Sequence, residues 1–563
     1  MHFALTLLLL AAVLALTWRY LGSYLEAVYS GRVGWLSRVE GVIYRLLGVD
    51  PSREQRWRQY AVSLVVFSGV SLLLTYGLLR LQGQLPLNPQ HLPAASPFLS
   101  WNTAVSFITN TNWQNYAGET TMSYLSQMAA LTVQQFASAA VGMAVAIALV
   151  RGFSRAGART IGNFWVDTVR GCLYVLLPIA FVAGAVFVAQ GAVQTLAGPA
   201  FIRDALNGAT QLIPRGPVGF MESIKQLGTN GGGFFNANGA DPLENPSQLT
   251  NLLSVVLLLS IPVALTYTFG KMVGSRRQGL ALLAAMGLIF AVWTGFTGYA
   301  ESQPNPAVAA AGVVAQPQGN MEGKEVRFGV LDSTLYDVAS TQTSTGSVDS
   351  TPDSYTPLGG FGLLTGMMLG EITPGGAGSG LYTLLLFAMV AVFIGGLMVG
   401  RTPEYLGKKI QAREVKLASL GVLVMPVVVL VTTGIATALP VGRAGAFNSG
   451  PHGFTEILYA LTSQANNNGS AFAGLNGNTA FYNLAGGIDM LAGRFGIMLP
   501  VLALAGALAA KQTVPVSLGT FRTDNATFVV LLLGVILIVG GLTFFPALSL
   551  GPLLEQLSHG RFF

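Results

Sequence analysis

The chain has 563 residues, of which 52% are hydrophobic and only 10% are charged, and its formal net charge at pH 7 is +6. Soluble proteins usually carry about 25% charged residues, so the composition excludes a soluble globular protein and indicates a polytopic membrane protein. We attribute the positive balance to basic cytoplasmic loops and not to nucleic acid binding. One cysteine, Cys172, excludes a disulfide framework within the chain, and the four histidines are scattered without metal-binding spacing.

Ten apolar runs are long enough to cross a bilayer, which needs roughly 20 residues of helix. The first run lacks the basic start and the small-residue cleavage site of a signal peptide, so we expect it to be retained. We predict membrane-spanning helices over residues 3–23, 61–83, 128–150, 171–191, 250–270, 280–300, 377–400, 417–438, 484–510 and 526–548.

Most of the 30 lysines and arginines gather in alternate loops between these runs. Loops rich in Lys and Arg stay in the cytoplasm, so we predict that both termini are extracytoplasmic. The basic loops cover residues 32–58, 151–170, 271–277, 401–416 and 511–522.

Four short polar tracts lie in the loops on the opposite side. Each is rich in Gly, Asn, Thr and Ser, and corresponding residues recur at steps of 119, 115 and 123 positions. One such tract is an ordinary turn, but four at one period predict a structural unit used four times around an axis. The tracts are Thr109–Gln114, Gly228–Gly233, Thr343–Ser347 and Asn466–Ser470.

A short apolar or amphipathic segment precedes each tract, over residues 98–107, 219–227, 334–340 and 454–462. These segments are too short to span, so each is predicted to be a re-entrant half-helix. Non-helical backbone at membrane depth survives only when it is buried in protein or lines an aqueous cavity. We therefore predict an all-α polytopic membrane protein with ten transmembrane helices. Four pseudo-fourfold helix–pore-loop–helix repeats surround a central ion filter, with one extra helix at each end.

The predicted divisions of the chain follow from this repeat. The third pore repeat also contains a long outer loop and a broken helix. The divisions are an N-terminal helix with a cytoplasmic loop (1–60), pore repeats one to four (61–160, 161–275, 276–412 and 413–515) and a C-terminal helix (516–563).

A ring of backbone carbonyls can replace the water shell of a potassium ion without holding it too tightly for release. Glycines can take the backbone angles that turn carbonyls inward, and nearby Asn, Thr and Ser side chains can hold the loop shape. The tracts contain no Asp or Glu, which disfavours calcium and magnesium. The predicted filter residues are Asn110, Thr111, Asn112, Gln114, Thr229, Asn230, Gly231, Ser344, Thr345, Gly346, Asn467, Asn468 and Gly469.

Charged residues within the apolar regions are few and therefore informative. Glu371 lies near Pro374 in a glycine-rich stretch that should break a helix, and a break below a filter suits a gate or a side exit for the ion. Alternatively, Glu371 only pairs with a basic residue and Pro374 is a kink. Arg494 lies within the ninth predicted helix. Lys225 precedes the second tract, where it either snorkels outward or repels anions.

The chain carries no recognisable catalytic motif: no phosphate loop, no Asp-Lys-Thr-Gly phosphorylation sequence and no Ser-His-Asp or His-Glu-x-x-His set. An intramembrane enzyme would need a carboxylate pair, a His cluster or a Ser/Lys pair at one depth, and the sequence offers none. If ATP drives transport, we expect its hydrolysis on another subunit.

The polar tracts lie within longer strings that resemble one known family. Nearly end to end, the chain resembles the potassium-binding A subunits of bacterial Kdp potassium-transporting ATPases. A Cys-Gly pair is common in the third tract of that family, whereas this chain has Thr345-Gly346, which still offers the carbonyl of Thr345. The strings are TNTNWQ (109–114), GTNGGGFFNAN (228–238) followed by ENP (244–246), GSGLY (378–382), GRTPEYLGKK (400–409) and QANNNGSAF (464–472).

The resemblance implies the fold of the superfamily of potassium transporters. It also implies a place in the bacterial inner membrane, in a complex with a P-type ATPase catalytic subunit (B), a C subunit and often a one-helix F peptide. Potassium is then the transported ion. It is selected on the outside and passes through an intramembrane tunnel to the B subunit, which alone uses ATP.

Three site assignments follow from the same resemblance. Gln114 matches a filter-proximal glutamine linked in the family to high affinity. The broken helix near Glu371 and the basic loop from Arg401 to Lys416 would flank the tunnel and the pump interface. The alternative is a stand-alone channel or an ion-gradient-driven potassium transporter of the same superfamily.

Overall fold

The computed structural model describes residues 2–204, 206, 208–313, 315–369, 372–398, 400, 402–515 and 521–558. Within these residues, ten helices are long and apolar enough to cross a membrane, and each overlaps one of the ten predicted runs. They are α1 (His2–Tyr29), α3 (Trp57–Leu81), a π-helical turn (Ser126–Thr132) leading into α6 (Val133–Ser154), α7 (Phe164–Arg170) running through a π-helical turn (Gly171–Leu176) into α8 (Leu177–Ala189), α10 (Gln248–Met272), α11 (Arg276–Glu301), α15 (Ser379–Met398), α16 (Ala412–Ala438), α19 (Ala480–Ala509) and α20 (Ala526–Leu550).

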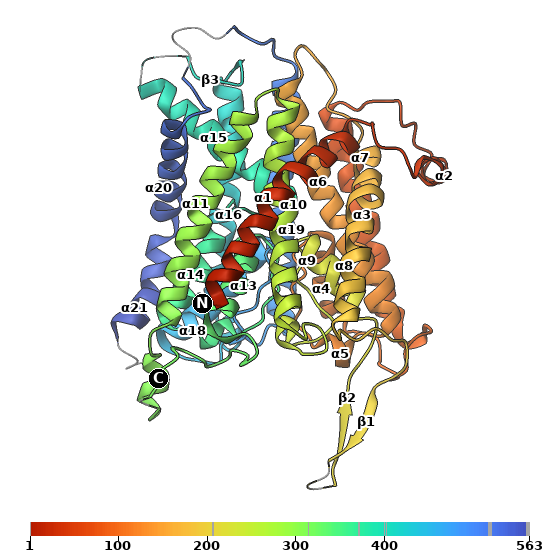
Figure 1. Ribbon diagram of the computed structural model, residues 1–563, viewed down its shortest axis with the longest axis vertical. Coiled ribbons are helices and arrows are strands. Elements are labelled where there is room, and N and C mark those ends of the chain that lie inside the picture. The colour runs from red at the N-terminus through yellow and green to blue at the C-terminus, as the bar shows by residue number, and fades with distance from the viewer. Residues whose placement is uncertain are drawn as a thin grey trace.

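Four shorter helices match the predicted half-helices: α4 (Pro97–Ile108), α9 (Gly219–Leu227), α13 (Gly329–Thr341) and α18 (Gly450–Ala465). All four lie in the lower half of the bundle in Figure 1, each between two spanning helices. The predicted repeat is therefore confirmed in outline. The remaining helices are α2 (Ser37–Leu47), α5 (Gly118–Thr121), α12 (Pro306–Ala310), α14 (Pro357–Met368), α17 (Pro440–Arg443) and α21 (Pro552–Leu557).

Local sequence explains where two of these helices begin. Ser96 and Thr356 act as N-caps, because their side chains accept hydrogen bonds from the backbone N–H groups of Leu99 and Gly359. A proline follows each cap, at the one helical position where its missing N–H costs nothing. Ser-Pro and Thr-Pro pairs thus fix the start of α4 and of α14.

Two small antiparallel hairpins are the strands found in the described residues. They are β1 (Ala200–Arg203) with β2 (Thr210–Ile213), and β3 (Glu404–Tyr405) with β4 (Lys408–Lys409). Neither was predicted. Both lie in loops outside the bundle (Figure 1), so the all-α fold class stands.

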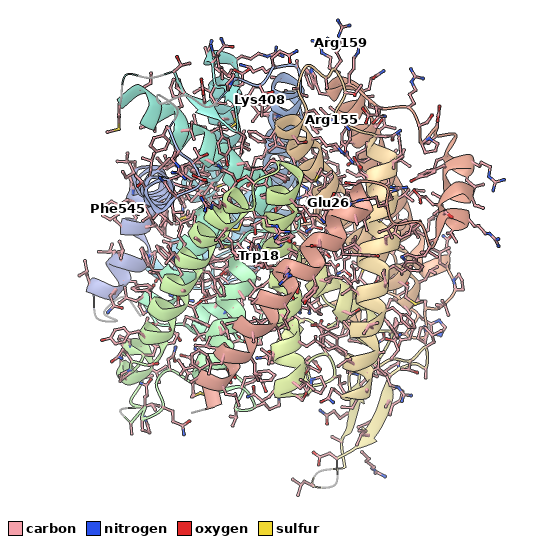
Figure 2. All side chains as sticks on the ribbon, turned by 45° about the horizontal axis from the view of Figure 1, so that its top comes forward. Trp18, Glu26, Arg155, Arg159, Lys408 and Phe545 are labelled. Carbon is pink, nitrogen blue, oxygen red and sulfur yellow. The ribbon has the colours of Figure 1, made fainter. Side chains whose placement is uncertain are left out.

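The basic loops meet at the other end of the bundle. Arg155, Arg159 and Lys408 all lie at the top in Figure 2. Arg155 forms a salt bridge of 2.7 Å with Glu54, and the Lys408 ammonium donates to the carbonyl oxygens of Arg155 and Lys511. Segments far apart in the sequence therefore share one end, as the predicted topology requires.

The core of the bundle is made by helices that are apolar on all sides. In α6, 94% of the most apolar stretch is buried, whereas in α1 only 6% is buried. A helix that is apolar all round belongs inside a membrane bundle, and small residues let its neighbours approach closely. Gly152 shows this, because a Cβ on it would stand 2.7 Å from the carbonyl oxygen of Ala505 in α19.

The seventh predicted span differs from the other nine. It begins at Ser379, and a separate helix, α14, precedes it. The backbone between them carries Pro374 and several glycines, which interrupt the helix as predicted. Glu371 and Arg401, which were predicted to lie at a gate and at a pump interface, fall outside the described residues.

Candidate ion filter

Each polar tract starts where a half-helix ends, with the same turn. The backbone N–H of the third tract residue bonds back five residues into the helix, which closes the helix end. The bonds are Thr111 to Ser106 (2.9 Å), Asn230 to Lys225 (2.9 Å), Thr345 to Ser340 (3.1 Å) and Asn468 to Ser463 (2.8 Å). Four segments with different sequences therefore have one backbone conformation.

In all four tracts, residues with left-handed backbone angles alternate with residues without them. Two residues in each have positive φ, separated by one residue that does not. Such alternation turns successive carbonyls toward the same side of the chain, whereas a regular strand points them to opposite sides. The positive values are 66° and 56° at Asn110 and Asn112, 50° and 85° at Thr229 and Gly231, 54° and 82° at Ser344 and Gly346, and 56° and 98° at Asn467 and Gly469.

The four tracts close into a ring. In three of them, the second left-handed residue is a glycine that packs on a carbonyl of the next tract. A Cβ on Gly231 would stand 1.5 Å from the oxygen of Thr345; on Gly346, 2.6 Å from that of Asn468; and on Gly469, 1.9 Å from that of Thr111. The first tract has Asn112 at this position, and its carbonyl lies against Gly232 of the second tract, 2.8 Å from a Cβ placed there.

Amide side chains join neighbouring tracts. Asn110 donates to the carbonyl of Thr229 (2.8 Å) and accepts from the side chain of Asn230 (2.7 Å). Gln114 and the backbone of Gly233 exchange two hydrogen bonds of 3.0 Å each. These bonds tie the first tract to the second, so the ring shape is fixed by side chains that sequence analysis placed in the filter.

Amide side chains also join the fourth tract to the first tract and to the end of α13. The Asn467 amide donates to the hydroxyl of Thr111 (3.0 Å), and the Asn468 amide donates to the carbonyl of Thr341 at the end of α13 (2.9 Å). The structure thus brings all thirteen predicted filter residues to one ring or to its immediate rim.

The half-helices add a favourable field. Their C-terminal ends meet at the ring, and a helix C-terminus carries a partial negative charge from its unpaired carbonyls. Four such ends favour a cation at the centre without any carboxylate in the tracts. The arrangement can bind a dehydrated monovalent cation and still release it.

The cavities on the two sides of the ring are unequal. One, called the outer cavity because it lies on the side predicted to be extracytoplasmic, has a volume of about 670 Å³ and is lined by Gln114, Glu456 and Phe472, among others. The inner one has about 30 Å³ and is lined by Ser344, Asn467 and Arg494, among others. The pocket on one side of the ring is therefore much larger than the pocket on the other side.

The interrupted helix lines part of the smaller pocket. The backbone N–H of Ala377 donates to the hydroxyl of Thr229 (2.9 Å), and that of Gly375 donates to the carbonyl of Gln342 (2.8 Å). Pro374 therefore lies directly behind the second and third tracts. Arg494, from α19, donates to the carbonyl of Ser138 (3.0 Å) beside the same space.

A buried ion cluster supports the second tract and was not predicted. Lys225 does not snorkel outward: its side chain is 0% exposed, and its ammonium contacts Glu222 (2.6 Å) and Glu244. The ammonium also donates to Asn238 (2.7 Å), whose amide donates to the carbonyl of Gly231 (2.9 Å). The Glu-Asn-Pro string that begins at Glu244 was the only sequence signal of this role.

Fold and site together define a class, the polytopic membrane transport proteins with a pseudo-fourfold ion filter made by one chain. The family model described as "Potassium-transporting ATPase A subunit" matches residues 7–557. The chain belongs to this family.

Several similar proteins carry the name of the same family. A protein of Mesorhizobium japonicum called potassium-transporting ATPase potassium-binding subunit is 53% identical over 99% of both chains. Relatives of the same name from Methylobacterium nodulans and Paramagnetospirillum magneticum are each 54% identical, over 97% and 98% of this chain and 96% and 97% of their own.

Among solved structures, the potassium transporter TrkH from Vibrio parahaemolyticus has a similar fold. Its TM-score is 0.50 at 17% sequence identity, over 76% of this chain and 82% of TrkH. This similarity supports the fold assignment.

Proposed function

We propose that this chain binds extracytoplasmic potassium in the tract ring and passes it to the ATP-hydrolysing subunit of a high-affinity uptake pump. The observation that carries the proposal is the ring itself: four tracts of equal backbone conformation between a wide vestibule and a narrow inner cavity. Its oxygen ligands are neutral, which suits potassium better than a divalent ion.

The path beyond the ring is proposed from the size of the inner cavity. The small inner cavity, of about 30 Å³, supports a path on which the ion leaves sideways through a tunnel beside the interrupted helix. Pro374 shapes this exit, together with Glu371. The B subunit hydrolyses ATP, and the C subunit and a one-helix F peptide complete the complex in the bacterial inner membrane, with both termini of this chain outside.

The chain divisions proposed above fit this scheme. Residues 61–160, 161–275, 276–412 and 413–515 each contribute one quarter of the ring, and the flanking segments 1–60 and 516–563 each add one spanning helix.

The test uses a bacterium deficient in potassium uptake that carries this chain with its neighbouring subunits. We expect high-affinity rubidium uptake that stops when ATP hydrolysis by the B subunit is inactivated, and co-purification of B with this chain. Uptake by this chain alone, dependent on an ion gradient and without B, would instead favour the stand-alone transporter.

Gln114 is expected to set the affinity for potassium. The change Gln114→Ala removes both hydrogen bonds to Gly233, each worth about 1 kcal/mol, and loosens the join between the first two tracts. We expect KM for rubidium uptake to rise by about tenfold or more, with a smaller change in maximal rate. Gln303→Ala, at an exposed outer glutamine, is the matched control. An equal effect of both changes would contradict the role of Gln114.

The pump interface is expected to lie at the basic hairpin that follows Arg401. Lys409 is exposed at the end where the basic loops meet. Lys409→Glu reverses its charge, and we expect less B subunit to co-purify and uptake to fall. Arg38→Glu, on the exposed surface of α2, changes charge equally at another loop. Unchanged assembly and flux with Lys409→Glu would refute this placement.

A further inference from the structure

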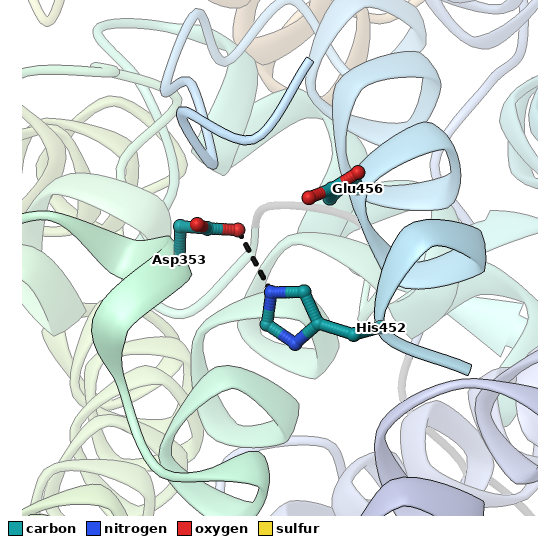
Figure 3. Close-up of side chains that lie close together, drawn as sticks. All are labelled: Asp353, His452 and Glu456. Carbon is teal, nitrogen blue, oxygen red and sulfur yellow. Dashed lines mark hydrogen bonds and ion pairs between the residues drawn. The ribbon is translucent and has the colours of Figure 1, made fainter. Parts of the chain in front are cut away.

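A histidine and three carboxylates meet on the outer side of the ring. His452 and Glu456 lie one turn apart on α18, and Asp353 follows the third tract in a short 3-10 turn (Figure 3). One ligand atom from each lies within 4.8 Å of the others. This cluster was not predicted, because its residues come from segments about a hundred positions apart.

The imidazole is held from both sides. Its Nε2 lies 2.9 Å from Oδ1 of Asp353, and its Nδ1 lies 3.0 Å from Oε1 of Glu555 in α21. A carboxylate on one ring nitrogen is the usual means of fixing a metal-binding histidine, because it orients the ring and leaves the other nitrogen for the metal. Here the other nitrogen faces Asp353 and Glu456.

The Glu456 carboxylate is held in place as well. It is fully buried and accepts hydrogen bonds from the backbone N–H of Phe447 (3.0 Å) and the side-chain amide of Asn448 (2.7 Å). Gly474 leaves room between the two carboxylates, since a Cβ there would stand 2.2 Å from Oε1 of Glu456 and 2.5 Å from Oδ1 of Asp353.

We propose that Asp353, His452 and Glu456 form a binding site for one divalent transition-metal ion of the Zn²⁺ class. Such ions take imidazole nitrogen and carboxylate oxygen at about 2.0–2.2 Å, which sets ligands on neighbouring corners roughly 3 Å apart. The 2.9 Å between Nε2 and Oδ1 matches that spacing, and Glu456, with an oxygen within 4.8 Å of both atoms, supplies the third ligand. Imidazole is a poor ligand for magnesium and calcium, so the site excludes these ions.

A proton competes with the metal. The carboxylates of Asp353 and Glu555 raise the pKa of His452 to about 10, so without metal an imidazolium bridges them. The ion displaces this proton, and all binding experiments are therefore made at one fixed pH.

A metal ion bound at this site changes the charge on the wall of the outer cavity. Glu456 lines the same outer cavity as Gln114, so exchange of the imidazolium proton for a divalent ion adds one positive charge and makes this wall less negative close to the approach of potassium. If the proposed uptake function holds, micromolar Zn²⁺ raises KM for rubidium.

The decisive test is direct binding, which does not depend on the proposed function. The purified complex without a polyhistidine tag is stripped with chelator and titrated with radioactive Zn²⁺ in excess Mg²⁺. We expect one saturable Zn²⁺ per complex, and at least tenfold weaker binding after His452→Gln, which removes the metal-binding nitrogen and keeps an amide that can donate to one of the two carboxylates. His91→Gln, at an exposed histidine, is the matched control and should leave the affinity unchanged.

Asp353→Asn serves as a second variant, because it removes one ligand charge at a partly exposed position even if His452→Gln fails to assemble. Stoichiometric binding that survives both changes would overturn the proposal. So would the absence of a saturable site in the unmodified complex, which would leave the cluster as a proton-bridged link between α18 and α21. Zinc binding without any effect on uptake would retain the site and remove its influence on the vestibule.

Discussion

Gly231→Asp is expected to abolish high-affinity potassium uptake. The residue has φ of 85°, which costs a non-glycine residue about 1–2 kcal/mol, and a Cβ would stand 1.5 Å from the carbonyl oxygen of Thr345. Backbone cannot yield to such an overlap without opening the ring, and the added carboxylate places a charge among neutral ligands. We expect apparent rubidium affinity to fall by at least about a hundredfold, or about 2.7 kcal/mol, with loss of discrimination against sodium.

Gly274→Asp is the matched control. Gly274 also has positive φ, 75°, but a Cβ on it meets nothing within 4 Å. Both variants therefore carry the backbone cost, and only one carries the collision. Uptake by membranes with verified amounts of complex should be near normal for Gly274→Asp. Unchanged affinity and selectivity in Gly231→Asp would mean that the tracts are ordinary turns.

Lys225→Met is expected to destabilise the protein strongly. The ammonium contacts the carboxylates of Glu222 and Glu244, all within a site that is at most 1% exposed. Removing one partner of a buried ion pair costs about 3–5 kcal/mol, because a charge is left without compensation. We expect a lower midpoint of thermal unfolding in detergent and poor recovery of the complex.

Two further variants test whether the loss of stability comes from an unpaired charge or from lost packing. Lys225→Met combined with Glu244→Gln removes one of the two buried carboxylates that lose their cation, and part of the lost stability should return. Arg32→Met removes an ion pair with Glu26 whose arginine is 56% exposed, and such pairs contribute under about 1 kcal/mol. If Lys225→Met unfolds no earlier than Arg32→Met, the ion cluster does not support the ring.

Much of the fold could be predicted because two periodic signals agree. Runs of about 20 apolar residues must be helical in a membrane. Basic residues in every second loop then determine the direction in which each helix crosses it. The tract spacing then locates the pore repeats. The break at Pro374 was predictable as well, because proline and glycine interrupt a helix by their own geometry.

The residues of the candidate filter could be named from the sequence, but their positions and contacts could not. The residues of the tracts are unlike one another, and only the structure shows that Asn112 occupies the position that Gly231, Gly346 and Gly469 occupy elsewhere. The support behind the tracts depends on contacts between distant segments, such as Lys225 with Glu244 and His452 with Asp353. The spacing of residues along the chain does not predict which of these side chains pair.

A ring made by a single polypeptide can break its own symmetry. In a filter of four identical subunits, any attachment is copied four times, and the pore can only widen or narrow evenly. Here the segment around Pro374 is hydrogen-bonded to the quadrants formed by the second and third tracts, through Thr229 and Gln342. Any displacement of that segment would act first on these two quadrants, to which its backbone is bonded. A one-sided pull would suit the lateral path proposed above, toward an ATP-hydrolysing subunit at the flank of this chain.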